Sequence, residues 1–135
     1  MLKKGKIKPR TFSNTLPKKL SGELATAKRL NVKPFRAGSP EFNKAINEGE
    51  KLKWAVTKEG DLLFIPAIKH QEEIAHSVIA KGQPVLAAGE AQVAGSRGQY
   101  FVLDITNHSG HYLPDFNSLE LGKAAFKLND LSNGI

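Results

Sequence analysis

Apolar and polar positions along the chain follow two periodicities, which predict both helices and strands. Apolar residues spaced by three and four are typical of an amphipathic helix, and short apolar runs bounded by glycine or proline are typical of strands. In chain order the patterns predict helices at 21–30 and 41–50, strands at 52–57 and 62–65, a helix at 71–80, strands at 84–94 and 99–106, and a helix at 118–131. This order predicts an α+β fold, with N-terminal helices packed on a small antiparallel β-sheet of about four strands and a C-terminal helix.

Serine, proline and glycine mark the ends of the predicted elements. Ser21 and Ser39 stand where helix N-caps are expected, and Pro40 would take the first position of the second helix, where a missing N–H costs nothing. Gly60 falls between the two apolar runs of the first hairpin, and a Gly-Ser-Arg-Gly turn at 95–98 separates those of the second. Each of these two strand pairs is therefore predicted to be antiparallel.

Basic side chains are concentrated at the N-terminal end of the chain. The net charge is +7, yet residues 1–40 hold 11 Lys and Arg against a single acid, Glu23, whereas residues 41–135 hold 9 basic and 12 acidic residues. The sequence thus predicts a basic arm or linker at 1–36 and one domain at 37–135. A basic arm on a mildly acidic body favours an anionic partner, nucleic acid before a membrane surface, although a solvated linker would have the same composition.

Composition and motifs exclude several classes of protein. The chain has no cysteine, which excludes disulfides, thiolate metal sites and cysteine nucleophiles. No apolar run approaches the roughly 20 residues that span a bilayer, and no signal-peptide pattern is present, so we expect no membrane span. Phosphate-binding loops and serine-hydrolase elbows are also missing from the sequence.

The segment Asn107–Pro114 carries the strongest chemical signal in the sequence. It holds two of the four histidines, His108 and His111, directly after an apolar strand. Histidine is the side chain whose ordinary pKa lies nearest neutrality, which suits acid–base catalysis. Residues three apart in a straight strand face opposite sides, so the intervening Ser-Gly turn would have to bring both imidazoles to one pocket. Three interpretations remain open: both histidines are catalytic, one is catalytic and the other structural, or the segment is a polar turn without a catalytic role.

A carboxylate and a guanidinium accompany this segment on the predicted second hairpin. On the predicted strand at 84–94, side chains alternate between the two faces, so Glu90 is expected on the face opposite to that of Val85 and Ala87. Arg97 lies in the turn that follows. Carboxylate, guanidinium and imidazole together suit RNA cleavage: a base takes the 2′-hydroxyl proton, an acid protonates the 5′-leaving oxygen, and a cation stabilises the phosphorane. We expect no cofactor. Exposed strand and turn charges are the alternative interpretation.

His76 is a further catalytic candidate, on the predicted helix at 71–80. A histidine beside an apolar helical stripe is more often a partly buried structural residue, with its ring nitrogens hydrogen-bonded, than a catalyst. A metal site would need His76 or Asp104 as a third ligand beside the histidine pair, and that spacing matches no zinc pattern. We therefore expect no metal.

Residues that can hydrogen-bond or stack on a nucleotide are candidates for substrate binding. Tyr112 could present its hydroxyl to a phosphate or stack on a base, with core packing as the alternative. The candidates are Tyr112, Ser109, Asn107, Thr106 and Lys53.

Four stretches together resemble a known family. Trp54–Val56, Glu73–His76, Gly82–Glu90 and Asn107–Pro114 are similar to a C-terminal toxin domain of bacterial polymorphic toxins, the group called type 43. The resemblance covers roughly residues 50–130, and its most specific part is the Ser-Gly-His-Tyr-x-Pro signature at 109–114. Such domains end large secreted proteins of contact-dependent inhibition and Rhs-like systems.

The resemblance implies a function, partners and a location. It implies a toxin catalytic domain at 37–135, related in fold to barnase, EndoU, colicin and RelE ribonucleases, with Glu90, Arg97 and His108 or His111 as the catalytic set. It implies an RNA substrate, with tRNA as one candidate, and a cognate immunity protein, so that the chain would be a monomer or a toxin–immunity heterodimer. The domain would be secreted within a larger effector and act in the target-cell cytoplasm. An ADP-ribosyltransferase toxin using NAD, with Glu90 as the catalytic carboxylate, and a non-catalytic RNA-binding module are the alternatives.

Overall fold

The computed structural model describes residues 10–96 and 99–135, and it confirms the predicted α+β fold. The helices are the 3₁₀ turn η1 (Pro17–Lys19), α1 (Leu20–Arg29), α2 (Pro40–Asn47), α3 (Ser77–Ala80) and α4 (Phe116–Leu128). The strands are β2 (Leu52–Thr57), β3 (Leu62–Pro66), β4 (Ile68–Lys69), β5 (Glu72–Glu73), β6 (Val85–Ser96) and β7 (Gln99–Ile105). Four strands form an antiparallel sheet in the order β3-β2-β6-β7, and β4 and β5 form a separate two-stranded ribbon.

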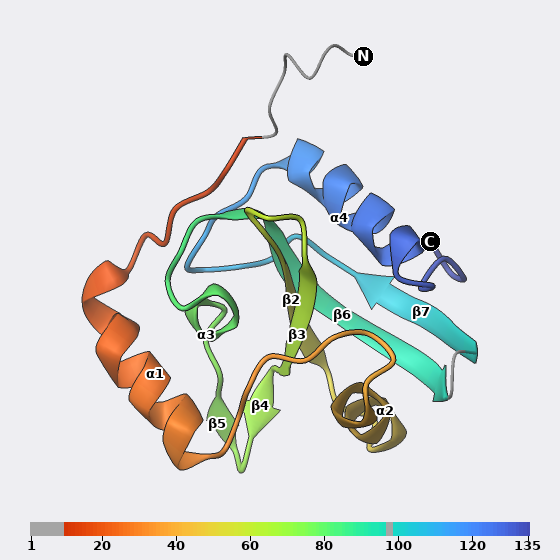
Figure 1. Cartoon of the computed structure of the whole chain (residues 1–135), viewed down its shortest axis with the longest axis horizontal. Helices are drawn as coiled ribbons and strands as arrows, with labels where there is room; N and C mark the ends of the chain where they lie inside the picture. Colours follow the sequence, from red (N-terminus) through yellow and green to blue (C-terminus); the bar gives the residue numbers. More distant parts are fainter. Residues whose placement is uncertain (1–9, 97–98) are drawn as a thin grey trace.

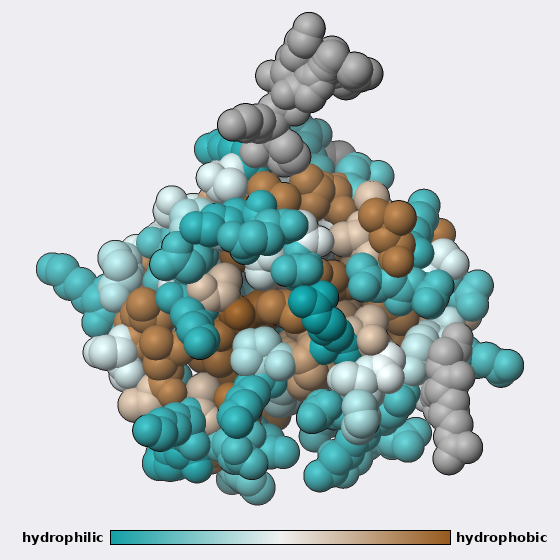
Figure 2. Space-filling model, in the orientation of Figure 1, coloured by the Kyte–Doolittle hydropathy of each residue, from teal (hydrophilic) through white to brown (hydrophobic). Residues whose placement is uncertain are grey.

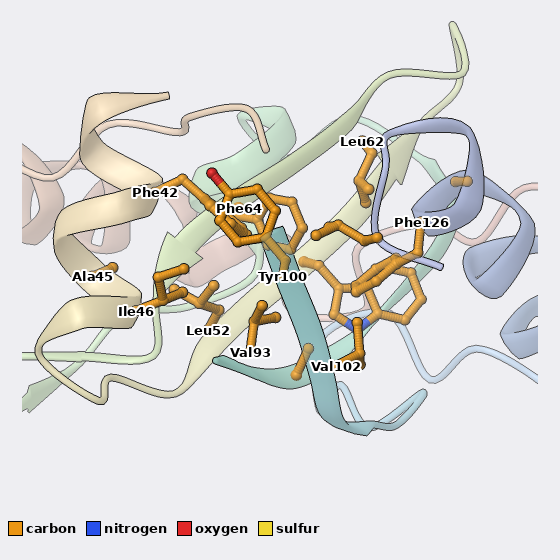
Figure 3. Close-up of a cluster of buried hydrophobic side chains, with 14 of the residues drawn as sticks. Phe42, Ala45, Ile46, Leu52, Leu62, Phe64, Val93, Tyr100, Val102 and Phe126 are labelled. Carbon is orange, nitrogen blue, oxygen red and sulfur yellow. The ribbon is translucent and has the colours of Figure 1, made fainter. Parts of the chain in front are cut away.

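Helices cover both faces of the sheet, so the protein has two apolar clusters. On one face α2 and α4 pack on the strands, and Figure 3 shows Phe42 of α2 and Phe126 of α4 among side chains of the sheet. On the other face lie α1 and α3 (Figure 1). The second cluster is on this side and contains Ala27, Ile74 and Val78. Because β2 and β6 lie at the centre of the sheet, residues that alternate along them reach both clusters.

Helix capping confirms one prediction and corrects another. Ser39 is the N-cap of α2, where its side chain accepts a hydrogen bond from the Phe42 N–H at 3.1 Å, and Pro40 is the first helical residue. Ser21, in contrast, lies inside α1, because the 3₁₀ turn η1 runs directly into the helix and Lys19 takes the N-cap position. The prediction of Ser21 as a cap was wrong, because the helix begins earlier, where the preceding 3₁₀ turn runs into it.

The predicted helix at 71–80 is wrong over its first half. His70 and Gln71 both adopt positive φ angles, 48° and 67°, and turn the chain so that Glu72 and Glu73 pair with Lys69 and Ile68. Only Ser77–Ala80 is helical. The apolar residues that indicated a long helix, Ile74, Val78 and Ile79, are indeed buried. They are buried, however, from an extended stretch followed by a single helical turn.

A break in alternation on β6 corrects the predicted faces of that strand. The β2–β6 register shifts between Val56 and Thr57, and Val85 joins the second cluster whereas Ala87 joins the first. Val85 and Ala87 therefore do not share a face as predicted. Beyond this irregularity the alternation holds, and Glu90 lies directly opposite Lys53 of β2.

The described part of the predicted arm at 1–36 is packed against the sheet. Residues 1–9 lie outside the described residues. Phe12 is buried and forms a bridge with Val85, with backbone N···O distances of 2.7 and 3.0 Å in the two directions. Phe35 pairs in the same way with Phe64 of β3. From Arg10 onward this segment thus shares the cores of the rest of the chain, with no separation at residue 36.

Polar side chains cover most of the surface in the view of Figure 2, with apolar patches between them. Some large apolar residues are exposed singly, among them Leu113 and Leu128, as is usual for globular proteins. In the described part of the chain no helix has the length and apolar character needed to cross a membrane.

Candidate active site

A cavity of about 730 Å³ opens where α1 and η1 meet the end of β5 and the loop after β7. Six ionisable side chains line this cavity. Three lysines, two carboxylates and a histidine line it, namely Lys18, Lys19, Lys53, Glu23, Glu73 and His111. Of the predicted site residues that the structure describes, His111 and Lys53 line this cavity.

His111 is hydrogen-bonded to Glu23 of α1. The imidazole Nε2 contacts Glu23 Oε2, and the two side chains are 18% and 16% exposed. The other carboxylate oxygen, Oε1, accepts a hydrogen bond of 2.6 Å from the hydroxyl of the fully buried Ser77. A carboxylate only accepts, so the contact requires a proton on Nε2 and leaves Nδ1 to exchange a proton with a ligand. Glu23 thus orients His111, in the way a carboxylate orients the histidine of a hydrolase triad.

The N-terminal segment also fixes the backbone of His111. The Thr15 N–H donates to the His111 carbonyl oxygen at 2.6 Å, and the Thr15 hydroxyl donates to the same oxygen at 2.9 Å. The chain continues through η1 into α1, which carries Glu23 back to the imidazole. One segment therefore holds His111 both by its carbonyl and by its ring.

Lys53 and Glu73 form an ion pair in the same cavity. Lys53 Nζ lies 2.9 Å from Glu73 Oε2, and the Lys53 side chain is only 6% exposed, whereas that of Glu73 is 75% exposed. The hydrogen bond and charge of Lys53 hold the pKa of Glu73 below its ordinary value, and the charge of His111 acts in the same direction. Glu73 is consequently a carboxylate at neutral pH.

His76 lies behind this wall and is 2% exposed. Its Nε2 donates to the Gly89 carbonyl oxygen at 2.7 Å. Burial lowers the pKa of His76 from 6.5 to about 3, and the charges of Lys53, His111 and His108 add to that effect against the opposing hydrogen bond to Gly89. A neutral, enclosed imidazole is suited to holding α3 against β6 rather than to transferring protons.

Burial of neutral His76 makes the protein sensitive to acid. The unfolded chain binds a proton at His76 near pH 6.5, whereas the folded protein resists it until about pH 3. Between these limits the unfolded state holds more protons, so the free energy of unfolding should fall with falling pH by up to about 1.4 kcal/mol per pH unit from this group. Urea denaturation from pH 7 to 4 should show a shallower fall for His76→Gln, which keeps an N–H donor. His70→Asn, at an exposed turn, should keep the wild-type slope; equal slopes for wild type and His76→Gln would contradict this account.

The other predicted catalytic residues lie elsewhere. His108 is exposed and does not line the cavity. Glu90 is also outside the lining, and its carboxylate pairs with Lys51 at 3.1 Å. Arg97 lies outside the described residues. The structure therefore singles out His111 from the histidine pair and separates it from Glu90.

Most of the predicted substrate-binding residues shape the loop after β7. Tyr112 is 2% exposed, packs in the second cluster and donates its hydroxyl hydrogen bond to the Gln83 carbonyl at 3.0 Å; burial, followed by the charge of Glu23, raises its pKa to about 12. Ser109 is buried, and its hydroxyl accepts a hydrogen bond from the Tyr112 N–H.

Thr106 and Asn107 hold the start of the same loop. The Thr106 hydroxyl accepts hydrogen bonds from the N–H groups of Glu90 and His108. The Asn107 side chain donates a hydrogen bond to the Asp115 carbonyl oxygen. Their hydrogen bonds set the path of the loop and with it the position of His111.

Glu23, Ser77 and Glu73 were not predicted from the sequence as site residues. A signal for Glu23 was present, because it is the single acid among the first 40 residues. An isolated carboxylate in so basic a segment is a candidate for a specific pairing. Ser77 and Glu73 carried no such signal, since their neighbours predicted an ordinary helix.

A second cavity, of about 700 Å³, lies between α2 and the segment at 31–36. Its lining contains lysine, arginine and glutamate side chains but no histidine. Within residues 10–96 and 99–135 no three His, Asp or Glu side chains are grouped so that they could hold a metal ion. The cavity beside His111 is therefore the better candidate for acid–base chemistry.

That cavity combines an oriented imidazole, an ionised carboxylate and a nearly buried ammonium group. Such a set can donate a proton, accept a proton and stabilise a negative charge. Comparison of the chain with protein-family models, curated proteins and solved structures finds no match.

Proposed function

We propose that this chain is a metal-independent endoribonuclease whose active site is the cavity beside His111. The observation that carries the proposal is that the Glu23–His111 pair and the Lys53–Glu73 pair line the same cavity. The residues provide two proton-transfer groups and a cation, which cleavage of RNA through its own 2′-hydroxyl requires. The cavity volume lies within the range usual for ligand sites.

The two pairs of side chains suggest a division of roles. Glu73, ionised at neutral pH, accepts the proton of the 2′-hydroxyl as its oxygen attacks the adjacent phosphorus. His111 in its protonated form donates a proton to the 5′-oxygen as the bond from phosphorus to that oxygen breaks. Lys53 stabilises the charge that develops on the phosphoryl oxygens. The products are a 2′,3′-cyclic phosphate and a 5′-hydroxyl, with no water or metal consumed.

The proposed biological setting follows from the resemblance of Asn107–Pro114 to polymorphic toxins. In that setting the domain would be delivered within a larger secreted effector, cut cellular RNA in the cytoplasm of the target cell, and be neutralised by an immunity protein. An excess of lysines at the proposed site is compatible with an acidic inhibitor, because long-range attraction speeds association.

The test is cleavage of a labelled oligoribonucleotide by the purified chain in the presence of EDTA. We expect fragments ending in 2′,3′-cyclic phosphate, and no cleavage at a position where the 2′-hydroxyl is replaced by hydrogen. Glu73→Gln should lower the rate by about 100-fold or more. Glu72→Gln is the matched control, because Glu72 is the neighbouring carboxylate, pairs with Arg29 and does not line the cavity.

The same experiment distinguishes the alternatives. If the RNA stays intact after incubation with increasing concentrations of the wild-type chain, the ribonuclease proposal is excluded. Transfer of label from NAD to a protein acceptor would instead favour an ADP-ribosyltransferase. RNA retained on the protein but uncut would favour a binding module.

A further inference from the structure

The cavity beside His111 contains two cations that the proposed reaction does not use. Lys18 and Lys19 belong to η1, are exposed, and line the cavity together with Lys53. Neither forms an ion pair within residues 10–96 and 99–135, and the remaining residues contain no Asp or Glu side chain.

The carboxylates of the cavity are already engaged. Glu73 pairs with Lys53, and Glu23 pairs with His111 while accepting a hydrogen bond from Ser77. No carboxylate of the wall is left to compensate Lys18 and Lys19. The cavity therefore carries, at its η1 side, two lysines that form no ion pair with its carboxylates.

These two lysines also have a defined position relative to His111. Thr15 is bonded to the His111 carbonyl by both its N–H and its hydroxyl, and η1 begins two residues later. Pro17 starts the turn, and the Lys19 N–H closes it on the Leu16 carbonyl at 3.1 Å. The backbone that carries the lysines is thus anchored to the catalytic candidate itself.

We propose that Lys18 and Lys19 form a second phosphate subsite, which binds a backbone phosphate adjacent to the one that is cleaved. The inference rests on the proposed function and extends it to the substrate: the preferred ligand carries at least two phosphates on consecutive nucleotides. Two ammonium groups outside any ion pair suit the negatively charged oxygens of a backbone phosphate, to which lysine binds as a point charge. The subsite sets affinity and register on the strand and takes no part in proton transfer.

Binding of small nucleotides tests this subsite without any cleavage. Isothermal titration calorimetry at low salt would compare adenosine 3′,5′-bisphosphate with adenosine 5′-monophosphate, using the full chain. We expect the wild type to bind the bisphosphate about 10-fold more tightly, and the K18Q/K19Q variant to lose that preference. K28Q is the matched control, because Lys28 is an exposed lysine of α1 that does not line the cavity; it should bind as the wild type does.

Cleavage kinetics provide the second measurement. With a trinucleotide substrate the K18Q/K19Q loss should appear in KM rather than in kcat, and the slope of log affinity against log salt for an oligonucleotide should fall by about 0.7 for each lysine removed. Equal bisphosphate affinity in wild type and K18Q/K19Q would overturn the subsite, as would an equal loss in K28Q. If RNA stays uncut while the bisphosphate preference holds and depends on Lys18 and Lys19, the ribonuclease proposal fails and the phosphate subsite stands.

Discussion

RNA cleavage by the His111→Asn variant should be about 10²- to 10⁴-fold slower than by the wild type. Asparagine is similar in size to part of the imidazole and can still hydrogen-bond to Glu23, but it cannot carry a proton to the leaving oxygen. The loss should appear in kcat, measured with a labelled oligoribonucleotide at neutral pH. Far-UV circular dichroism and the urea midpoint would show that the variant is folded.

Two further variants test how Glu23 contributes. Glu23→Gln should slow cleavage by about 10- to 100-fold, because an amide no longer holds the proton on His111 Nε2. Since Glu23 acts through His111, the double variant should be no slower than His111→Asn alone. An additive loss in the double variant would mean that Glu23 acts separately.

His108→Asn is the matched control for the same experiment. His108 belongs to the same segment and has the same side chain, but it is exposed and lies outside the cavity lining. Its replacement should leave the rate within a few-fold of wild type. Should His108→Asn lose as much activity as His111→Asn, the assignment of the proton donor to His111 would be wrong.

Gly89→Ala should prevent stable folding or cost roughly 3 kcal/mol or more of the free energy of unfolding. A Cβ at Gly89 would lie 1.7 Å from the Thr106 carbonyl oxygen and 2.9 Å from the Asn107 Cα. These are backbone atoms, and Thr106 cannot retreat easily because its N–H donates to the Glu90 carbonyl at 2.8 Å. The clash also falls at the residue whose carbonyl accepts from His76.

Urea denaturation of Gly89→Ala beside Gly22→Ala measures this effect. A Cβ at Gly22 would meet nothing within 4 Å, and the residue lies in α1. Alanine there should stabilise the protein by roughly 0.5–1 kcal/mol, through helix propensity alone. A Gly89→Ala protein as stable as the wild type would show that β6 and the end of β7 are not held in this close approach.

Local signals predicted the helices and strands where neighbouring residues suffice to define them. Ser39 and Pro40 define the start of α2 by capping chemistry, and the alternation around Gly60 defines the β2–β3 hairpin. The prediction failed at 71–76, where the backbone of His70 and Gln71 enters the left-handed region. Positive φ is uncommon for non-glycine residues, and the apolar spacing there therefore predicts a longer helix.

The site was less accessible to sequence reasoning than the fold. His111 and Lys53 were named from the sequence, but the carboxylates that engage them, Glu23 and Glu73, were not. Glu23 and His111 are separated by 88 residues, and only the packing of α1 beside the loop after β7 brings them together. The burial of His76 and Tyr112 likewise depends on elements distant in the chain.

The sequence by itself determined the α+β class, the two main hairpins, the C-terminal helix and the histidine-bearing segment, because periodicity, caps and turns act over a few residues. Only the tertiary structure decided which histidine faces a cavity, which carboxylate orients it, and that residues 10–36 belong to the same body as the sheet. These outcomes depend on burial and on charge pairs between segments far apart in the chain. Such contacts form only when the two apolar faces of the sheet are covered, because the paired side chains come from elements that meet only in the folded chain.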